Sequence, residues 1–204
     1  MDRRRLCAFV QMTAPAAVYR LPLAADAPTE RRRRLQAWAA DYGRLCGRDF
    51  TALPLAESKP GQKPRFLGDT PCFSLSHSGD LLLCAFSLTP VGLDLEKLRP
   101  LPQAPALARR FFHPQEREWL AGKDALFFFL VWTAKEAAVK WSGQGINQNF
   151  PRFSVIPAFC RNQPIRLEGQ DLALQWLTPE PGYIACLATT PPRPPLRLKN
   201  GGDG

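Results

Sequence analysis

Apolar residues recur every three or four positions in several segments, which is the pattern of a helix with one buried face. The clearest case lies between residues 30 and 46, where Thr29 is a plausible N-cap and Gly47 stops the pattern. The same reasoning, with Pro114 at a first helical position, predicts three further helices. They cover residues 106–111, 114–120 and 124–141, and Gly143 and Gly145 follow the last.

Short apolar runs and alternating polar and apolar positions predict strands elsewhere. Turn signals at Ser78-Gly79-Asp80 and at Thr89-Pro90 separate three consecutive strands, which predicts an antiparallel meander. The predicted strands cover residues 6–12, 18–21, 72–77, 81–88, 91–96, 153–156, 165–167, 172–176 and 183–187.

A proline-rich stretch around residues 100–105 is the best internal boundary of the chain. It divides the predicted elements into an N-terminal half, residues 1–99, and a C-terminal half, residues 100–190. Each half combines helices with a small antiparallel sheet, so the predicted fold class is α+β. Residues 191–204 are rich in proline and end in glycine, which predicts a disordered tail.

The composition excludes several classes of protein. With 45% hydrophobic and 22% charged residues, the chain of 204 residues is not intrinsically disordered. Its longest apolar run, residues 125–132, is far shorter than the ~18 residues that cross a bilayer. No cleavage signal follows the basic N-terminus, so we expect a cytoplasmic protein without membrane association. The six cysteines contain no Cys-x-x-Cys, which excludes a zinc ribbon.

The formal net charge of +9 indicates an anionic partner, which is a nucleic acid, a phosphorylated small molecule or an acidic protein. Four arginines, residues 31–34, begin the first predicted helix. They are either a solvated surface or an anion site, because a helix N-terminus and arginines both attract phosphate.

The motif Asp94-Leu95-Glu96 places two carboxylates on one side of a predicted strand, about 6–7 Å apart. Their mutual repulsion is roughly 2–3 kcal/mol at an effective dielectric constant of ~20. Either solvent or a bound cation relieves it. The apolar residues before Asp94 make full exposure less favourable.

On the last predicted helix, Trp132, Glu136 and Lys140 are spaced by four residues and share one stripe. The pair Glu136 and Lys140 is either a surface ion pair or a metal-binding carboxylate beside a phosphate-binding lysine. In the second case Glu136 adds a third oxygen ligand to Asp94 and Glu96. Such oxygen ligands suit magnesium.

Two further motifs contain polar residues that, taken singly, have structural explanations as well as functional ones. Ser76 and His77 are adjacent on a predicted strand and point to opposite faces, so they cannot form a nucleophile–base pair. His77 is either structural or a ligand contact at the strand end. Glu116 lies in the first turn of a short helix, where it, or equally Glu118, favours the helix dipole.

In their order and spacing these motifs resemble the 4'-phosphopantetheinyl transferases. The motifs are Ser-His-Ser, Val-Gly-Leu-Asp-Leu-Glu, Phe-Phe-x-Pro-x-Glu and Trp-x-x-Lys-Glu-Ala-x-x-Lys. The resemblance covers about residues 60–145 and is closest to the larger, surfactin-synthetase-activating type. It implies two similar halves related by a pseudo-twofold axis, with coenzyme A and magnesium in the cleft between them.

The resemblance also implies roles for individual residues. Asp94, Glu96 and Glu136 hold Mg²⁺ against the coenzyme A pyrophosphate. Lys140 stabilises charge on the same phosphates, and Glu116 matches the general base. The implied contacts to coenzyme A are Ser76, His77, Lys63 of Gln62-Lys63-Pro64, and one of the arginines 31–34, of which Arg34 is favoured.

The implied reaction transfers phosphopantetheine from coenzyme A to a serine of an apo acyl or peptidyl carrier protein and releases adenosine 3',5'-bisphosphate. Carrier proteins are acidic, which suits a chain of charge +9. We expect a monomer that does not act on nucleic acid. Two alternatives fit the residues without the resemblance: a magnesium-dependent nuclease or phosphatase, and a non-catalytic nucleic-acid-binding module.

Overall fold

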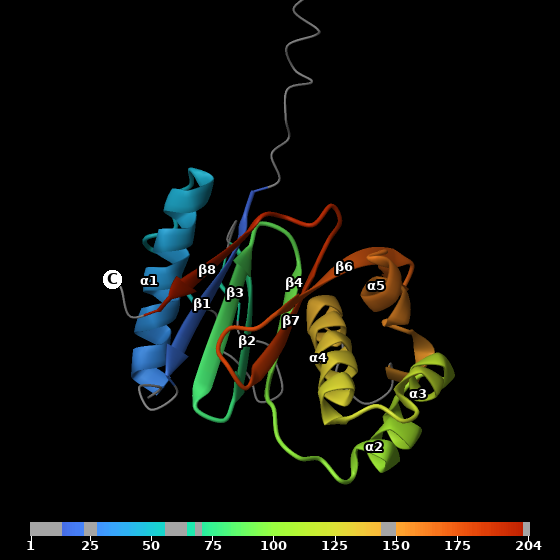
Figure 1. The fold of residues 1–204 in the computed structure, drawn as a ribbon. Coiled ribbons are helices and arrows are strands. Elements are labelled where there is room, and N and C mark those ends of the chain that lie inside the picture. Colours follow the sequence, from blue (N-terminus) through green and yellow to red (C-terminus); the bar gives the residue numbers. More distant parts are fainter. Residues whose placement is uncertain (1–13, 23–27, 56–64, 68–70, 144–149, 202–204) are drawn as a thin grey trace, which may run out of the picture.

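Two four-stranded sheets form the centre of the protein in a computed structural model that describes residues 14–22, 28–55, 65–67, 71–143 and 150–201 (Figure 1). The first sheet has the strand order β2-β3-β1-β8 and the second has the order β4-β7-β6-β5. The strands are β1 (Ala16–Pro22), β2 (Cys72–Ser78), β3 (Leu81–Ser87), β4 (Val91–Lys97), β5 (Ile165–Leu167), β6 (Gln170–Leu177), β7 (Tyr183–Thr189) and β8 (Leu196–Asn200).

The helices cover the outer faces of the two sheets. They are α1 (Pro28–Cys46), α2 (Ala104–Phe111), α3 (Pro114–Leu120), α4 (Ala125–Ser142) and α5 (Ile156–Arg161), with a 3₁₀ turn, η2 (Phe150–Arg152). Helix α4 begins after Asp124, whose side chain accepts the backbone N–H of Leu126, and it ends at Gly143 in the left-handed region. The predicted helices are therefore confirmed, with boundaries shifted by one or two residues.

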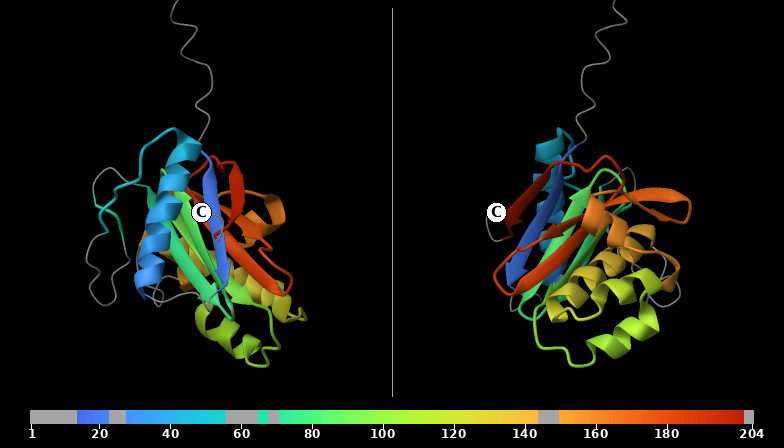
Figure 2. Two further views of the ribbon diagram at one scale, coloured as in Figure 1. Left: turned by 90° about the vertical axis from the view of Figure 1, so that its left-hand side faces the viewer. Right: turned by 45° about the vertical axis from the view of Figure 1, so that its right-hand side comes forward.

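Three apolar layers hold these elements together, and strand periodicity produces them. On β3, Leu82, Cys84 and Phe86 pack toward α1, whereas Leu81, Leu83 and Ala85 pack between the two sheets. A third layer joins the second sheet to α4. The order is thus α1, first sheet, second sheet, α4 (Figures 1 and 2). This confirms an α+β fold with two sheet-and-helix halves.

The predicted meander is only partly correct. Strands β2 and β3 form the expected antiparallel hairpin, but β4 pairs with β7 in the second sheet. The reason is that β4 has two buried faces: Leu93 and Leu95 pack between the sheets, while Gly92 and Asp94 face α4. By sheet membership β4 therefore belongs with the C-terminal strands, and not with the predicted N-terminal half.

Two further predictions from the sequence are wrong. The expected strand over residues 153–156 does not form: residues 153–155 are irregular and lead into α5, which has Pro157 in its first turn and is closed by Asn162 in the left-handed region. The expected disordered tail contains β8, which pairs in parallel with β1. Leu196 packs against the core between the two sheets, and Lys199 pairs with Asp41 of α1, which holds this strand on the N-terminal sheet.

Some predictions fall on residues outside the described segments. They are the strand over residues 6–12 and the loop that carries Lys63. Among the described helices, none is long and apolar enough to cross a membrane.

Candidate functional site

Strand β4 and helix α4 bring the predicted metal ligands to one place. The two elements lie in very close contact at Gly92, where an added Cβ would lie 1.9 Å from the carbonyl oxygen of Ala137. Only glycine permits this approach. It places the outward-facing carboxylates of β4 beside Glu136 and Lys140, one residue before Ala137 and Trp141 on the helix. We call Asp94, Glu96 and Glu136 the carboxylate cluster.

This close contact yields a first prediction. Gly92→Ala is expected to push α4 away from β4, which destabilises the fold by about 1–3 kcal/mol through overpacking. Any activity of the site falls with it, because Glu136 and Lys140 move relative to Asp94. Urea unfolding and turnover per folded molecule measure the two effects. Unchanged stability and turnover would show that the helix contact does not set the site.

Asp94 is the centre of the site's polar contacts. Its Oδ1 accepts hydrogen bonds from Lys140 Nζ at 2.7 Å and from Ser76 Oγ at 2.9 Å. Lys140 Nζ also lies 3.1 Å from Ser76 Oγ. The second oxygen, Oδ2, is buried, and no group in the described segments hydrogen-bonds to it. A buried carboxylate oxygen without a partner is costly, which points to a ligand that this oxygen would bind.

The site carries more negative charge than its surroundings favour. The pKa of Glu136 is raised to about 7, mainly by burial and in addition by the charges of Asp94 and Glu96, against the opposing effect of Lys140. Burial likewise raises the pKa of Asp94, while Lys140 and Ser76 lower it. A cation bound among these carboxylates would lower both pKa values and stabilise the charged forms.

The residues fit a hard cation in their chemistry. The cluster offers carboxylate oxygens from β4 and α4, and Asp94 Oδ2 accepts no hydrogen bond from the described residues. Within the described part of the chain, no three His, Cys, Asp or Glu side chains are arranged as a finished metal site. The ammonium of Lys140 instead supplies the positive charge at Asp94 Oδ1.

A row of serines joins β2 to β4; Ser76 was singled out from the sequence as a coenzyme contact, but this structural role of the row was not predicted. Ser74, Ser76 and Ser78 accept hydrogen bonds from the backbone N–H groups of Leu93, Leu95 and Lys97, at 3.0, 3.2 and 3.0 Å. We call these three residues the serine row. They occupy the N–H groups along the free edge of β4 and so fix the register between the two sheets. The signal was present in the sequence as serine at every second position.

Glu116 is wholly buried, and its hydrogen-bond partners belong to residues outside the carboxylate cluster. Its Oε1 accepts hydrogen bonds from Lys135 Nζ and from the Val155 backbone N–H, and its Oε2 accepts one from the His113 backbone N–H, each at 2.9 Å. A general base must reach the proton it removes. The contacts of Glu116 favour a structural role, and the general base stays a prediction from the sequence.

Lys135 was also missed as a residue of interest. It is fully buried, donates to the Phe153 carbonyl at 2.7 Å and lies 4.1 Å from the centre of the Phe153 ring. Burial lowers its pKa to about 8, although the Glu116 carboxylate raises it. Together Lys135 and Glu116 tie α4, α3 and the 150–155 segment into one unit.

Of the other predicted coenzyme contacts, Lys63 lies outside the described residues, and the structure does not bring Arg34 or His77 to the cluster. Arg34 pairs with Glu30 at 2.7 Å and donates to the Gly201 carbonyl at 3.2 Å, beside β8. Strand β8 is three strands from β2, about 14 Å at the usual spacing of ~4.8 Å. His77 is exposed on the face of β2 opposite to Ser76, as alternation requires.

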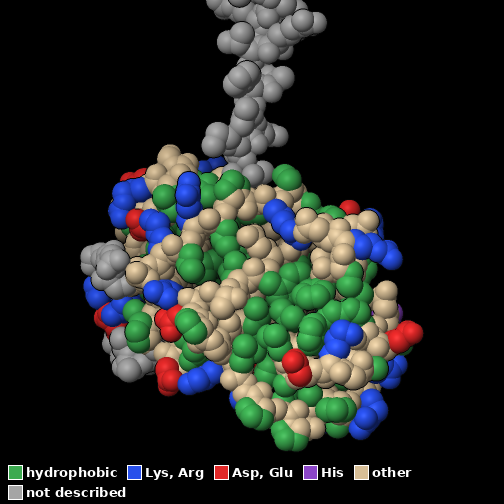
Figure 3. Space-filling view, viewed as in Figure 1, with side chains coloured by type: hydrophobic (Ala, Val, Ile, Leu, Met, Phe, Trp, Pro, Cys, Tyr) green, Lys and Arg blue, Asp and Glu red, His purple; other side chains and the backbone are tan. Residues whose placement is uncertain are grey.

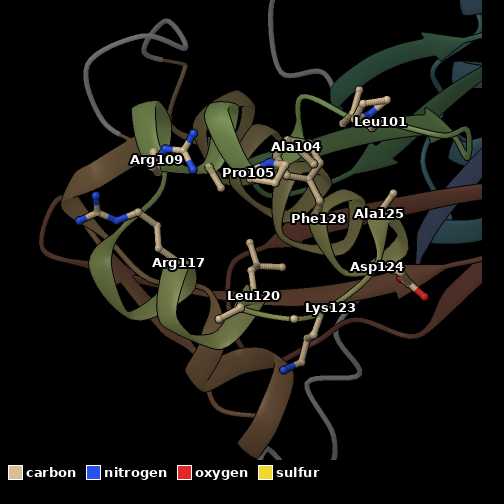
Figure 4. A pocket seen from close by; sticks show the side chains of 14 residues that line it. Leu101, Ala104, Pro105, Arg109, Arg117, Leu120, Lys123, Asp124, Ala125 and Phe128 are labelled. Atoms are coloured by element: carbon tan, nitrogen blue, oxygen red, sulfur yellow. The ribbon is translucent and has the colours of Figure 1, made fainter.

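A hollow of about 520 Å³ lies between α2, α3 and the start of α4. Its wall is mostly apolar, with Leu120 pointing into it, while Arg109 and Arg117 lie at one end (Figure 4). Lys123 also lines it. Hydrophobic side chains gather more generally over the half of the molecule that carries α4 and β6 (Figure 3).

Comparison with known proteins gives a consistent result. The model of the 4'-phosphopantetheinyl transferase superfamily matches residues 90–188. The chain is 43% identical over 139 residues to the 4'-phosphopantetheinyl transferase HetI of Nostoc sp., covering 65% of this chain and 57% of that protein. It is 37% identical over 87 residues to Sfp of Bacillus subtilis, covering 41% and 38%.

A third relative is matched over most of its length. The chain is 33% identical over 164 residues to the 4'-phosphopantetheinyl transferase AcpT of Salmonella typhi, covering 77% of this chain and 83% of that protein. By contrast, the matches span only about half of HetI and about two fifths of Sfp.

Proposed function

Since the chain belongs to the 4'-phosphopantetheinyl transferase superfamily, we propose that it transfers 4'-phosphopantetheine from coenzyme A to a serine hydroxyl of an apo carrier protein. The observation that carries this proposal is the convergence of Asp94, Glu136 and Lys140 where β4 meets α4. Buried carboxylates beside a lysine are the groups that a pyrophosphate substrate and its metal require.

Asp94, Glu96 and Glu136 would hold Mg²⁺, with the unpartnered Asp94 Oδ2 as the buried donor. When bound, Mg²⁺ supplies Lewis-acid stabilisation of the charge that builds on the leaving phosphate. Lys140 adds a positive charge within reach of the same place, and its present partners Asp94 and Ser76 hold it there. For Ser76, His77, Lys63 and Arg34, contact with coenzyme A remains a proposal from the resemblance.

The products follow from the substrate's chemistry. The serine oxygen of the carrier attacks the phosphorus attached to pantetheine, and the pyrophosphate bond to adenosine 3',5'-bisphosphate breaks. The serine proton must leave during the reaction. We retain Glu116 as the candidate base from the resemblance, although its burial speaks for a structural role.

We also propose that the protein acts as a monomer and that its carrier partner is acidic. The hollow between α2, α3 and α4 supports an acidic carrier, because an apolar wall with basic residues suits a helix with an apolar face and an acidic margin. Arg109 and Arg117 are both exposed, and either could meet such a margin.

The charge of this surface is directly testable. Arg109→Glu and Arg117→Glu are each expected to raise the KM for the carrier several-fold and to leave the KM for coenzyme A unchanged, because rim charges steer association. The effect should shrink at high salt. Arg197→Glu is the matched control, with the same charge change on exposed β8. An equal effect of all three substitutions would show that KM depends only on the net charge of the protein, and it would contradict a specific role for this surface.

Chromatography of the small-molecule product tests the proposed reaction. With coenzyme A and Mg²⁺, adenosine 3',5'-bisphosphate should form only when an apo carrier protein is present. Release without a carrier would indicate hydrolysis of the coenzyme A pyrophosphate by water, formation of inorganic phosphate would indicate a phosphatase, and cleavage of nucleic acid by the same preparation would indicate a nuclease. Each of these results would contradict the proposal.

A further inference from the structure

The serine row contacts β4 in two ways. Each hydroxyl accepts a backbone N–H, but Ser76 Oγ also donates to Asp94 Oδ1 at 2.9 Å and Ser78 Oγ donates to Glu96 Oε2 at 3.2 Å. Two of the three serines therefore connect the backbone of β4 with a carboxylate that β4 carries. Ser74 lies opposite Gly92, which has no side chain for it to bind.

Each of these bonds restricts a carboxylate that would otherwise rotate. Ser76 is 8% exposed and holds the Asp94 oxygen that Lys140 also binds, which turns Oδ2 toward its buried position. Glu96 is held at Oε2 by Ser78 and by Arg99 Nη1 at 2.9 Å, and neither contact involves Oε1. Each carboxylate thus has one oxygen fixed by protein groups.

We propose that Ser78 is a positioning residue for Glu96, and that Ser76 does the same for Asp94, so that the edge strand β2 of one sheet orients the cation-binding carboxylates of the other. This inference rests on the proposed function of the carboxylate cluster. The serine row then has two separable tasks: all three members fix the strand register, and only Ser76 and Ser78 orient carboxylates.

Ser78 gives the cleaner test, because Ser76 also contacts Lys140. Ser74 is the matched control: it makes the same bond to the backbone N–H of the following position on β4 and contacts no carboxylate of the cluster among the described residues. Ser78→Thr keeps the hydroxyl and suits a strand, so it should restore what Ser78→Ala removes.

The experiment measures Mn²⁺ binding to the full-length protein by electron paramagnetic resonance, without coenzyme A or carrier. Ser78→Ala should weaken Mn²⁺ binding about tenfold or more, as is typical when a group that orients a metal ligand is lost. Ser74→Ala should leave Mn²⁺ affinity unchanged, provided that circular dichroism shows it folded. Ser78→Thr should bind as the unmodified protein does.

The kinetics should separate in the same way. For Ser78→Ala, the Mg²⁺ concentration for half-maximal rate should rise about tenfold, while kcat at saturating Mg²⁺ stays near that of the unmodified protein. Equal Mn²⁺ affinity of Ser78→Ala and the unmodified protein would overturn this inference alone. Equal weakening by Ser74→Ala and Ser78→Ala would also overturn it. Failure of the unmodified protein to bind Mn²⁺ would overturn the metal proposal and this inference together.

Discussion

Replacing Asp94 with Asn is expected to lower turnover by about a hundredfold to a thousandfold, the scale associated with losing a group that stabilises charge in the transition state. Asn keeps the shape of the side chain and can still bond to Ser76. It removes the negative charge that holds Lys140 and would bind a cation. The fold should stay cooperative, because the ion pair is partly solvated at Lys140, whose side chain is 27% exposed.

A matched ion pair elsewhere serves as the control for Asp94→Asn. Asp80 pairs with Lys97 at 2.9 Å, close to the 2.7 Å between Asp94 and Lys140, but its side chain is exposed on the β2–β3 turn. Asp80→Asn should leave turnover unchanged. Turnover, thermal unfolding and the Mg²⁺ dependence of the rate are measured for both variants. Near-normal turnover of Asp94→Asn at moderate Mg²⁺ would remove Asp94 from the site.

Glu116→Gln is expected to act mainly on stability, with a loss of about 3–5 kcal/mol, because it leaves the buried Lys135 ammonium without its carboxylate. For a chain of this size that loss lowers Tm by roughly 6–20 °C. Both carboxylate oxygens of Glu116 accept hydrogen bonds, from the backbone N–H groups of Val155 and His113. Gln has only one oxygen, so it cannot accept both of these hydrogen bonds. Thermal unfolding and turnover per folded molecule are the measurements.

The double variant distinguishes structure from catalysis. Adding Lys135→Met to Glu116→Gln should recover part of the lost stability, because a buried charge without a partner is removed. Glu118→Gln, two residues along α3 and exposed, should match the unmodified protein. If Glu116→Gln instead kept its stability and lost 10²–10⁴-fold in turnover, the general-base hypothesis would be right.

Local signals were enough to predict most elements. The end of α4 could be predicted from Gly143, and the β2–β3 hairpin from Gly79, because caps and turns depend on residues adjacent in the chain. The pairing of β8 with β1 could not be predicted from local signals, because it joins residues about 180 positions apart. Neither proline content nor a short alternation reveals which sheet edge is free to accept a strand.

In the site, too, local spacing could be predicted from the sequence, whereas contacts between distant elements could not. The spacing of Asp94 with Glu96, and of Glu136 with Lys140, placed each pair on one face of its element, and the structure brings both pairs together. The burial of Glu116 depends on Lys135, on a helix nineteen residues later. An acidic residue in the first turn of a helix can stabilise the helix dipole, act in catalysis or form a buried ion pair. The sequence alone could not choose among these three roles for Glu116.

Intact-mass measurement of a carrier protein tests the central claim most directly. The full-length protein is incubated with coenzyme A, Mg²⁺ and an acidic apo carrier, and in parallel with a carrier whose acceptor serine is replaced by alanine. We predict that the apo carrier gains the mass of one phosphopantetheine, that the alanine carrier gains nothing, and that chelation of Mg²⁺ or Asp94→Asn prevents the gain. An unchanged mass of the apo carrier, with the protein folded and Mg²⁺ present, would contradict the account.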